Sequence, residues 1–336
     1  MNFVTGATGL VGSHVVFELL MQNKPVVALK RSISDVSKVE KLFSYYSTEY
    51  KNLLKKINWV EGDLSDTVNL ELILKDIKTV YHCAGLIAFN EKEAKELIRT
   101  NKEATSNIVN ICLQKKIQSF CHVSSVAALE NQDISKNIDE TVFWKSETPY
   151  MVYGLSKYLG EQEVWRGIEE GLNAVIVNPG VIIGPGFWNQ GSGELFTTCN
   201  RGIKFYIEGV TGFISAKDVA KSMIALCEAK KFGERFILIE NNYSFKEILE
   251  WMHKNFGKPT PSIKAGKFIL NAGRFFNFLL PNNKKISREI IAASLSKKYF
   301  SNKKLIQNID FQLHPIKECI FSTCDVFKSE TSIKSN

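Results

Sequence analysis

Three glycines, Gly6, Gly9 and Gly12, follow the first apolar run of the chain and open its first amphipathic segment. Glycine lets the backbone turn tightly and approach a neighbouring group closely. A helix that begins at such a turn points unpaired amides at an anion, so this position predicts a binding turn for a dinucleotide pyrophosphate. The spacing is Gly-x-x-Gly-x-x-Gly, and a strand-to-helix turn without a ligand is the alternative. The residues that we assign to the cofactor here are Gly6, Thr8, Gly9, Leu10, Val11 and Gly12.

Short apolar runs alternate with amphipathic stretches through the first half of the chain. We expect strands at 2–4, 26–29, 57–61, 79–82, 119–124 and 174–178, with helices at 11–22, 42–54, 70–75, 94–114 and 150–170. This alternation predicts βαβ units and therefore a parallel sheet. The fold class that follows is α/β, with a doubly wound Rossmann-type sheet of six parallel strands.

The alternation loosens after Pro179, where glycines and aromatic residues become frequent. We expect a smaller, mixed C-terminal lobe that binds the substrate, with a helix at 216–229, a strand at 235–239 and a helix at 245–256. The nucleotide-binding domain then covers 1–182, with 211–232 returning to it. The substrate lobe covers 183–210 and 233–325, and 326–336 is expected to be a frayed tail.

The composition is that of a globular protein, with 336 residues of which 44% are hydrophobic and 23% are charged. The net charge of +8 is spread over lysine pairs without a nucleic-acid-binding signature, so we expect a solvated basic face and no nucleic-acid partner. The seven cysteines include no Cys-x-x-Cys pair and the five histidines fit no ligand spacing, so no metal site is predicted. Reduced cysteines, and no room for a leader before the first strand, favour the cytoplasm.

One apolar stretch, 268–280, invites a membrane interpretation. It is shorter than the ~20 residues that a spanning helix needs, and it contains Arg274. We therefore expect no membrane span. A helix that covers the substrate cleft is the favoured interpretation, and contact with a membrane surface is the alternative.

Basic residues stand at the end of the second expected strand, where dehydrogenases that prefer NAD usually carry an acid for the ribose 2′-hydroxyl. Lys30 and Arg31 occupy this position, and the planar guanidinium of Arg31 suits a 2′-phosphate. NADP(H) is therefore the preferred cofactor, with NAD(H) left open; a surface basic pair is the alternative. The ends of the next two strands add further cofactor contacts at Asp63, Leu64, Cys83, Ala84 and Gly85.

Tyr153 and Lys157 are four residues apart in an expected helix, so their side chains share one face. A neighbouring cation favours the ionised form of a phenol and brings its pKa toward the working range. The pair can then protonate a carbonyl oxygen as hydride arrives, or act in reverse. Ser125, at the end of the strand 119–124, is assigned to hold the substrate oxygen. Ser124 is assigned to local turn bonding beside the cofactor, and a purely structural Tyr-x-x-x-Lys pair is the alternative.

The segments TGATGLVG, GDL, HCAG, SS, YGLSK and NPGVIIGPG occur in the order found in the extended short-chain dehydrogenase/reductases, the NAD-dependent epimerase/dehydratase family, and the chain resembles that family from 1 to about 186. The resemblance implies a Rossmann domain that binds NAD(P) and a catalytic triad of Ser125, Tyr153 and Lys157. It also implies that Lys157 holds the nicotinamide ribose. Asn101 matches the first residue of the family's Asn-x-x-Gly-Thr-x-Asn segment, in which Ala104 replaces the glycine. Homodimers are frequent in the family, which leaves a homodimer open here.

Within the family, the run 26–31 and the turn that begins at Asn178 resemble the dihydroflavonol reductase and cinnamoyl-CoA reductase branch. This resemblance points to reduction of a ketone or an aldehyde. Pro179, Gly180 and Ile182 are expected to line the nicotinamide side. The aromatic residues that could line a partly apolar substrate are Phe187, Trp188, Phe196 and Phe205, and packing of the second lobe's core is the alternative use of the same residues.

Three functions remain open at this point. The first is an NADP(H)-dependent oxidoreductase that reduces a small carbonyl compound, with Tyr153 as the general acid. The second is a nucleotide-sugar epimerase or dehydratase that keeps NAD tightly bound and returns the hydride to the same substrate. The third is a non-catalytic sensor that binds NADP, which the intact Tyr153 and Lys157 disfavour.

Overall fold

Seven parallel strands form the central sheet of the computed structural model, which describes residues 1–86, 94–129, 137–144, 152–267, 269–271 and 288–333. The strands lie in the order β10-β6-β5-β4-β1-β2-β3. Their bounds are β1 Asn2–Thr5, β2 Val26–Lys30, β3 Ile57–Glu61, β4 Thr79–His82, β5 Ser119–Val123, β6 Ala174–Pro179 and β10 Glu234–Leu238. Strand β6 is buried along its whole length, as expected for a central strand covered on both faces. The predicted Rossmann-type fold is confirmed.

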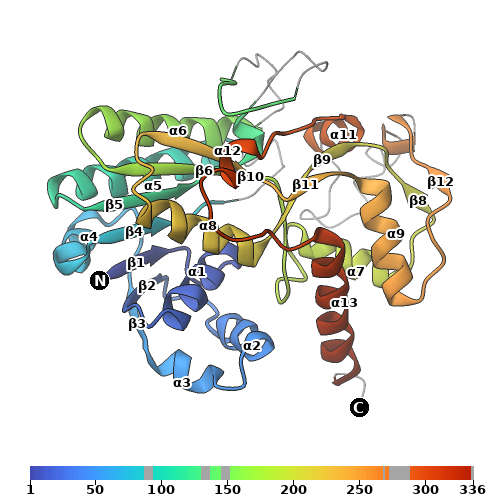
Figure 1. Ribbon diagram of the computed structural model, residues 1–336, viewed down its shortest axis with the longest axis horizontal. Coiled ribbons are helices and arrows are strands. Elements are labelled where there is room, and N and C mark those ends of the chain that lie inside the picture. Colours follow the sequence, from blue (N-terminus) through green and yellow to red (C-terminus); the bar gives the residue numbers. More distant parts are fainter. Residues whose placement is uncertain (87–93, 130–136, 145–151, 268, 272–287, 334–336) are drawn as a thin grey trace.

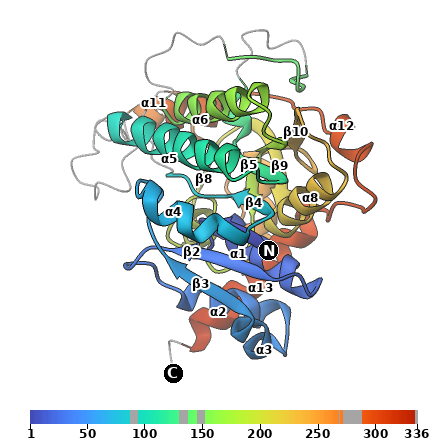
Figure 2. The same ribbon diagram turned by 90° about the vertical axis from the view of Figure 1, so that its left-hand side faces the viewer.

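Helices cover both faces of this sheet. Helices α4, α5 and α6 pack along one face, as Figure 2 shows, and α1 and α8 lie together on the other. The bounds are α1 Leu10–Met21, α2 Ser37–Tyr46, α3 Tyr50–Lys55, α4 Thr67–Ile73, α5 Ala94–Gln114, α6 Val152–Glu169 and α8 Ala216–Glu228, with short 3-10 turns η1 at Leu74–Asp76 and η3 at Val126–Ala128. This double cover leaves the carboxyl ends of the strands as the edge at which a ligand can bind.

The second lobe lies to the right of the sheet in Figure 1 and has its own core. Its mixed sheet has the order β11-β9-β7, and β12 pairs with β8 in a separate ribbon. The bounds are β7 Val181–Ile183, β8 Phe205–Tyr206, β9 Val210–Ser215, β11 Asn241–Ser244, β12 Ile263–Lys264, α7 Gly193–Arg201, α9 Phe245–Phe256, α11 Arg288–Leu295 and α13 Ile316–Ile333. The short helix α12, Lys303–Ile306, packs against β10 of the central sheet. Helix α9 begins at a capping box between Ser244 and Glu247 and ends at Gly257, whose φ of 65° is left-handed.

Three local expectations differ from the structure. The expected helix 42–54 is divided into α2 and α3, because Ser47 adopts an extended backbone between them. The strand expected at 235–239 belongs to the central sheet and not to the second lobe, since β10 pairs in parallel with β6. The expected frayed tail is helical as far as residue 333, and its Phe327 packs against Trp188 and Phe256.

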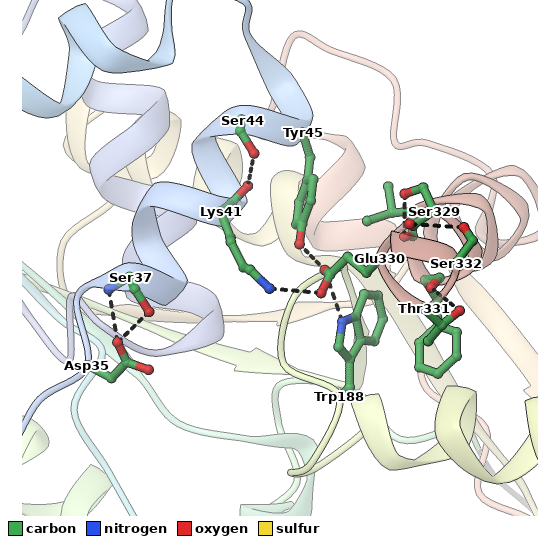
Figure 3. A network of polar contacts seen from close by, with 12 residues as sticks. Asp35, Ser37, Lys41, Ser44, Tyr45, Trp188, Ser329, Glu330, Thr331 and Ser332 are labelled. Atoms are coloured by element: carbon green, nitrogen blue, oxygen red, sulfur yellow. Dashed lines mark hydrogen bonds and ion pairs between the residues drawn. The ribbon is translucent and has the colours of Figure 1, made fainter. Parts of the chain in front are cut away.

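Helix α13 is held to the nucleotide-binding half by one carboxylate. Figure 3 shows Glu330 between Lys41, Tyr45 and Trp188. The carboxylate accepts hydrogen bonds from Lys41 Nζ at 3.1 Å, from Trp188 Nε1 at 3.1 Å and from the Tyr45 hydroxyl. Burial alone would raise the pKa of Glu330, but these three donors outweigh it and the pKa is lowered. Helix α13 therefore bridges α2 and the loop after β7.

Among the residues that the structure describes, no helix combines the length and the apolar character that crossing a membrane would require. The apolar stretch 268–280 lies almost entirely outside the described residues, so neither of its two interpretations is tested. The same described part of the chain contains no group of three or more His, Cys, Asp or Glu side chains arranged to hold a metal ion.

Candidate active site

The glycine turn between β1 and α1 is crowded by backbone on two sides. A Cβ on Gly6, whose φ is +64°, would lie 2.7 Å from Ala84 N, and a Cβ on Gly12 would lie 2.2 Å from Gly6 O. The sequence therefore uses glycine because no side chain fits. Helix α1 begins at Gly9 without a side-chain cap, which leaves its first amides available to an anion. Thr8, Leu10 and Val11 are half-buried around this turn, so the cradle fits a pyrophosphate.

Two groups predicted to contact the adenosine half meet beside the ends of β2 and β3. Arg31 is exposed, and its positive charge acts on the carboxylate of Asp63. The pKa of Asp63 is lowered, mainly by hydrogen bonds from the backbone amide and hydroxyl of Ser65 and to a smaller extent by Arg31. Lys30 ends β2 half-buried, and the carbonyl of Leu64 accepts a hydrogen bond from Asn107 at 2.9 Å. A basic and a carboxylate group thus share this edge.

The loop after β4 is fixed by Asn101. The Asn101 side chain accepts a hydrogen bond from Leu86 N at 2.8 Å and donates to Leu86 O at 3.1 Å and to Ser156 Oγ at 3.0 Å. The loop is also anchored by Ala84 N, which donates to Thr5 Oγ1 at 3.1 Å. Asn101 therefore joins this loop to the helix that carries Lys157.

The Lys157 ammonium group lies directly against the same loop. A Cβ on Gly85 would be 2.9 Å from Lys157 Nζ, so a side chain at this position would displace the ammonium group. Lys157 is 7% exposed and its Nζ donates to Val123 O at 3.2 Å. Burial lowers the pKa of Lys157 to about 8, although the nearby Cys83 opposes this shift. The loop after β4 and α6 together enclose one cation at the sheet edge.

Tyr153 and Ser125 are hydrogen-bonded through their side chains. Ser125 also begins the 3-10 turn η3, where its Oγ accepts from Ala127 N at 3.1 Å. Burial raises the pKa of Tyr153 to about 12, the Ser125 hydrogen bond lowers it, and Glu289 raises it. The sequence predicts the opposite net direction for this phenol. The difference arises because burial dominates and the Lys157 ammonium points at Val123 O.

Glu289 is a residue of the site that the sequence does not reveal. It comes from α11, is 7% exposed, and its carboxylate accepts from Val152 N at 3.1 Å and Tyr153 N at 3.3 Å. A carboxylate at the first amides of a helix satisfies unpaired donors and suits the helix dipole. Glu289 therefore caps α6 at the position of Tyr153. Its distance in sequence leaves no local signal for this role.

The Ser124 side chain makes a different contact from the one that the sequence suggests. It is 3% exposed, and its hydroxyl donates to Glu161 at 2.8 Å across 37 positions of the sequence. This contact replaces the expected local turn bonding, because alternate residues of a strand end point to opposite sides. The position of Glu161, eight residues after Tyr153 on the same helix face, is the sequence signal that could have identified this contact.

The turn after β6 brings the second lobe to the sheet edge. Gly180 N donates to Leu238 O at 3.0 Å, and a Cβ on Gly180 would lie 2.2 Å from Gly212 O. Pro179 is buried and Ile182 is half-buried. Gly184 lies close to Leu10, since a Cβ there would be 3.2 Å from Leu10 Cδ1. The start of the second lobe therefore lies beside the start of α1.

The four aromatic residues considered for the substrate lie in different environments. Phe196 is fully buried and its ring lies 5.8 Å from that of Trp188. Phe187 is 4% exposed, whereas Phe205 is 47% exposed on the β8–β12 ribbon. Packing in the core of the second lobe accounts for Trp188 and Phe196, as the alternative interpretation has it.

Comparison with known proteins identifies the family of this chain. The NAD-binding family described as Male sterility protein matches residues 4–242. The chain belongs to this family. It is an NAD(P)-dependent enzyme of the extended short-chain dehydrogenase/reductase type, as its motifs predict.

Two curated relatives carry the names of the predicted branch. A protein of Synechocystis sp. named as a dihydroflavonol 4-reductase is 26% identical over 99% of this chain and 96% of its own length. The cinnamoyl-CoA reductase CAD2 of Medicago truncatula is 26% identical over 73% of this chain and 78% of its own length. The expected resemblance to these reductases is confirmed.

Two solved structures share the fold over nearly the whole chain. The crystal structure of gox2253 has a TM-score of 0.81 and 27% identity, with 98% of each chain covered. The yeast methylglyoxal/isovaleraldehyde reductase Gre2, solved with NADPH, has a TM-score of 0.74 and 21% identity, with 98% of this chain and 99% of that chain covered.

Proposed function

We propose that this enzyme uses NADPH to reduce a ketone or aldehyde group of a partly apolar small molecule. The observation that carries the proposal is the hydrogen-bonded pair Ser125 and Tyr153, with Lys157 one helical turn away at the same sheet edge as the glycine turn. The reductase names of the relatives support the reaction class. The apolar character of the substrate rests on those names, because Trp188 and Phe196 are engaged in packing the core of the second lobe.

Each side chain of the triad has a separate task in this proposal. Bound NADPH supplies the hydride. Ser125 donates a hydrogen bond to the carbonyl oxygen and orients it toward Tyr153. Tyr153 gives its proton to that oxygen as negative charge develops there. Lys157 binds the nicotinamide ribose and stabilises the phenolate that remains on Tyr153.

We predict that Tyr153→Phe abolishes carbonyl reduction and leaves the affinity for NADPH within a few-fold of wild type. The phenol supplies the proton in the reaction, whereas the glycine turn and Lys157 provide the binding. NADPH oxidation with a panel of apolar aldehydes and ketones, beside a fluorescence titration of NADPH, measures both quantities. Retained turnover in the variant would overturn the assignment of Tyr153. NAD that co-purifies with the protein, with no net cofactor oxidation, would instead favour the epimerase alternative.

We predict that Arg31→Ala weakens NADPH binding by about tenfold or more and leaves NADH binding nearly unchanged. The guanidinium is exposed at the end of β2, where it can reach a 2′-phosphate that NADH lacks. Lys38→Ala, which removes an exposed cation in the first turn of α2, is the matched control. Equal losses for the two cofactors in Arg31→Ala would show that this residue does not distinguish them.

A further inference from the structure

The carboxylate of Glu161 is fully buried and accepts four hydrogen bonds. Glu161 lies on α6 one turn beyond Lys157 and two turns beyond Tyr153, and so on the same face of that helix. Its Oε2 accepts from Ser124 Oγ at 2.8 Å and from Asn178 Nδ2 at 2.9 Å. Its Oε1 accepts from Arg235 Nη1 at 2.9 Å and from Trp165 Nε1 at 3.2 Å.

A buried ion pair needs good geometry and further hydrogen bonds to offset its desolvation. Arg235 meets this requirement, because its guanidinium also donates to the carbonyl groups of Glu140, at 2.8 Å, and Val142. The Phe143 ring lies 4.9 Å from the centre of the guanidinium. Both charges are therefore fixed in place. The orientation of the Glu161 carboxylate is set by donors just after β5 and on β6, α6 and β10.

The carboxylate acts on the strand end that carries the proposed catalytic serine. Three consecutive residues at the end of β5 and just beyond it meet three residues of α6: Val123 meets Lys157, Ser124 meets Glu161, and Ser125 meets Tyr153. The Asn178 amide that donates to Glu161 also donates to Ser125 O, at 3.0 Å. Glu161 therefore holds Ser125 twice, through the preceding residue and through the amide of Asn178.

We propose that Glu161 is a positioning residue that fixes Ser125 against the helix face carrying Tyr153 and Lys157. The proposal rests on the proposed function, since that function gives Ser125 and Tyr153 their roles. The two oxygens of the carboxylate divide the task. Oε2 and its donors hold the catalytic strand end, whereas Oε1 joins α6 to Arg235 of β10 and accepts from Trp165 of α6 itself, outside that path.

This division provides a matched pair of variants. Ser124→Ala and Trp165→Phe each remove one neutral donor from the same carboxylate, on the Oε2 side and on the Oε1 side. If Glu161 were only structural, Trp165→Phe would be at least as harmful, because it also removes more buried volume. Under the proposal, Ser124→Ala lowers kcat by about tenfold and leaves NADPH affinity within about twofold, whereas Trp165→Phe keeps kcat within about twofold. Thermal unfolding of both variants is measured alongside.

A second measurement does not depend on turnover. In protein labelled with 3-fluorotyrosine, the fluorine resonance of residue 153 is assigned by its loss in Tyr153→Phe and followed against pH. The Ser125 hydrogen bond favours the ionised phenol, so the pKa of residue 153 rises when Ser125 is released. We expect this rise in Ser124→Ala, and in Glu161→Gln if that variant folds, but not in Trp165→Phe.

The outcomes separate the two proposals. A wild-type enzyme that reduces no carbonyl compound overturns the proposed function, and the fluorine titration still decides the role of Glu161. An unchanged titration in Ser124→Ala, or an equal shift in Trp165→Phe, overturns the positioning role whatever the reaction is. A shift confined to Ser124→Ala and Glu161→Gln supports it.

Discussion

The charge of Lys157 depends on the burial of its ammonium group. Its ammonium lies between the loop after β4 and the end of β5, with Val123 O accepting a hydrogen bond and a cysteine nearby. Burial disfavours the charged form of an amine, and the pKa falls to about 8. The proton of Lys157 is therefore lost within the range in which an enzyme assay can be carried out.

We predict that carbonyl reduction by the wild-type enzyme declines as pH rises through about 8. A lysine with a lowered pKa loses its positive charge at that pH, and the neutral amine no longer supports a phenolate on Tyr153. A profile of kcat/KM at saturating NADPH between about pH 6 and about pH 10 measures the decline. Lys157→Arg keeps its charge across this range, so its residual activity lacks the decline. A wild-type profile that stays flat to about pH 10 would contradict the prediction.

Spacing identifies some residues of the site and not others. Ser125, Tyr153 and Lys157 were predictable because a helix period and a strand end bring them together. Glu289 and Arg235 were not, since each reaches the site from an element far along the chain. The pKa of Tyr153 was expected to fall and instead rises, because the depth of burial has no signature in the local sequence.

At the scale of elements, α13 depends on partners that its own sequence does not reveal. The polar residues near its end suggest fraying, yet Phe327 packs on two aromatic rings and Glu330 accepts three hydrogen bonds. The donors Tyr45 and Trp188 lie 285 and 142 positions earlier. Helix propensity alone is a weak guide to such a segment, because its stability comes from docking.

We predict that Glu330→Gln lowers the free energy of unfolding by about 1–2 kcal/mol. The variant loses the charge that strengthens the bonds from Tyr45 and Trp188, and its amide has one acceptor where the carboxylate has two. Asp325→Asn is the control, because this exposed carboxylate on the same helix forms an ion pair with Lys328, one turn away. We expect the control to change stability by less than about 0.5 kcal/mol. Urea unfolding compares the two variants. Equal losses of unfolding free energy would argue against a stabilising role for the contacts of Glu330.

At the scale of the whole molecule, the interior of the nucleotide-binding half holds buried histidines in the neutral form. Burial lowers the pKa of His82 to about 3 and that of His14 to about 4, and lowers the pKa of His122 well below its usual value. The rings of His82 and His122 stack at 5.3 Å between neighbouring strands. Burial therefore opposes protonation of all three rings in the folded protein.

We predict that stability falls as pH is lowered from about 6.5 toward about 4. In this window the histidines are protonated in the unfolded chain but stay neutral in the folded protein. Each therefore lowers the free energy of unfolding by up to about 1.4 kcal/mol per pH unit. Urea unfolding at about pH 7 and about pH 5.5 measures the loss. His122→Phe keeps a ring against His82 and cannot titrate, so its loss should be smaller by roughly one third. An identical loss in the variant would exclude His122 as a contributor.

The alternation of apolar runs was sufficient to predict the class of the sheet, and six of its seven strands were placed. The seventh, β10, was assigned to the other lobe because the irregular stretch before it hides the crossover through α8. The order of strands depends on which edges meet, and a single sequence does not record that. The same reasoning explains why Phe196 was considered for the substrate: an aromatic residue in a loosely patterned stretch gives no sign of the core that will enclose it.

The contact of Glu330 on α13 with α2 has a consequence for synthesis on the ribosome. Helix α2 emerges early, but the carboxylate that receives Lys41 and Tyr45 is made about 285 residues later, which at typical elongation rates is roughly half a minute. During that interval the nascent nucleotide-binding half exposes the surface of α2 without its partner. Closing so long a loop is slow compared with pairing neighbouring strands. The last step of folding is therefore expected to be the return of a late segment onto one of the first to appear.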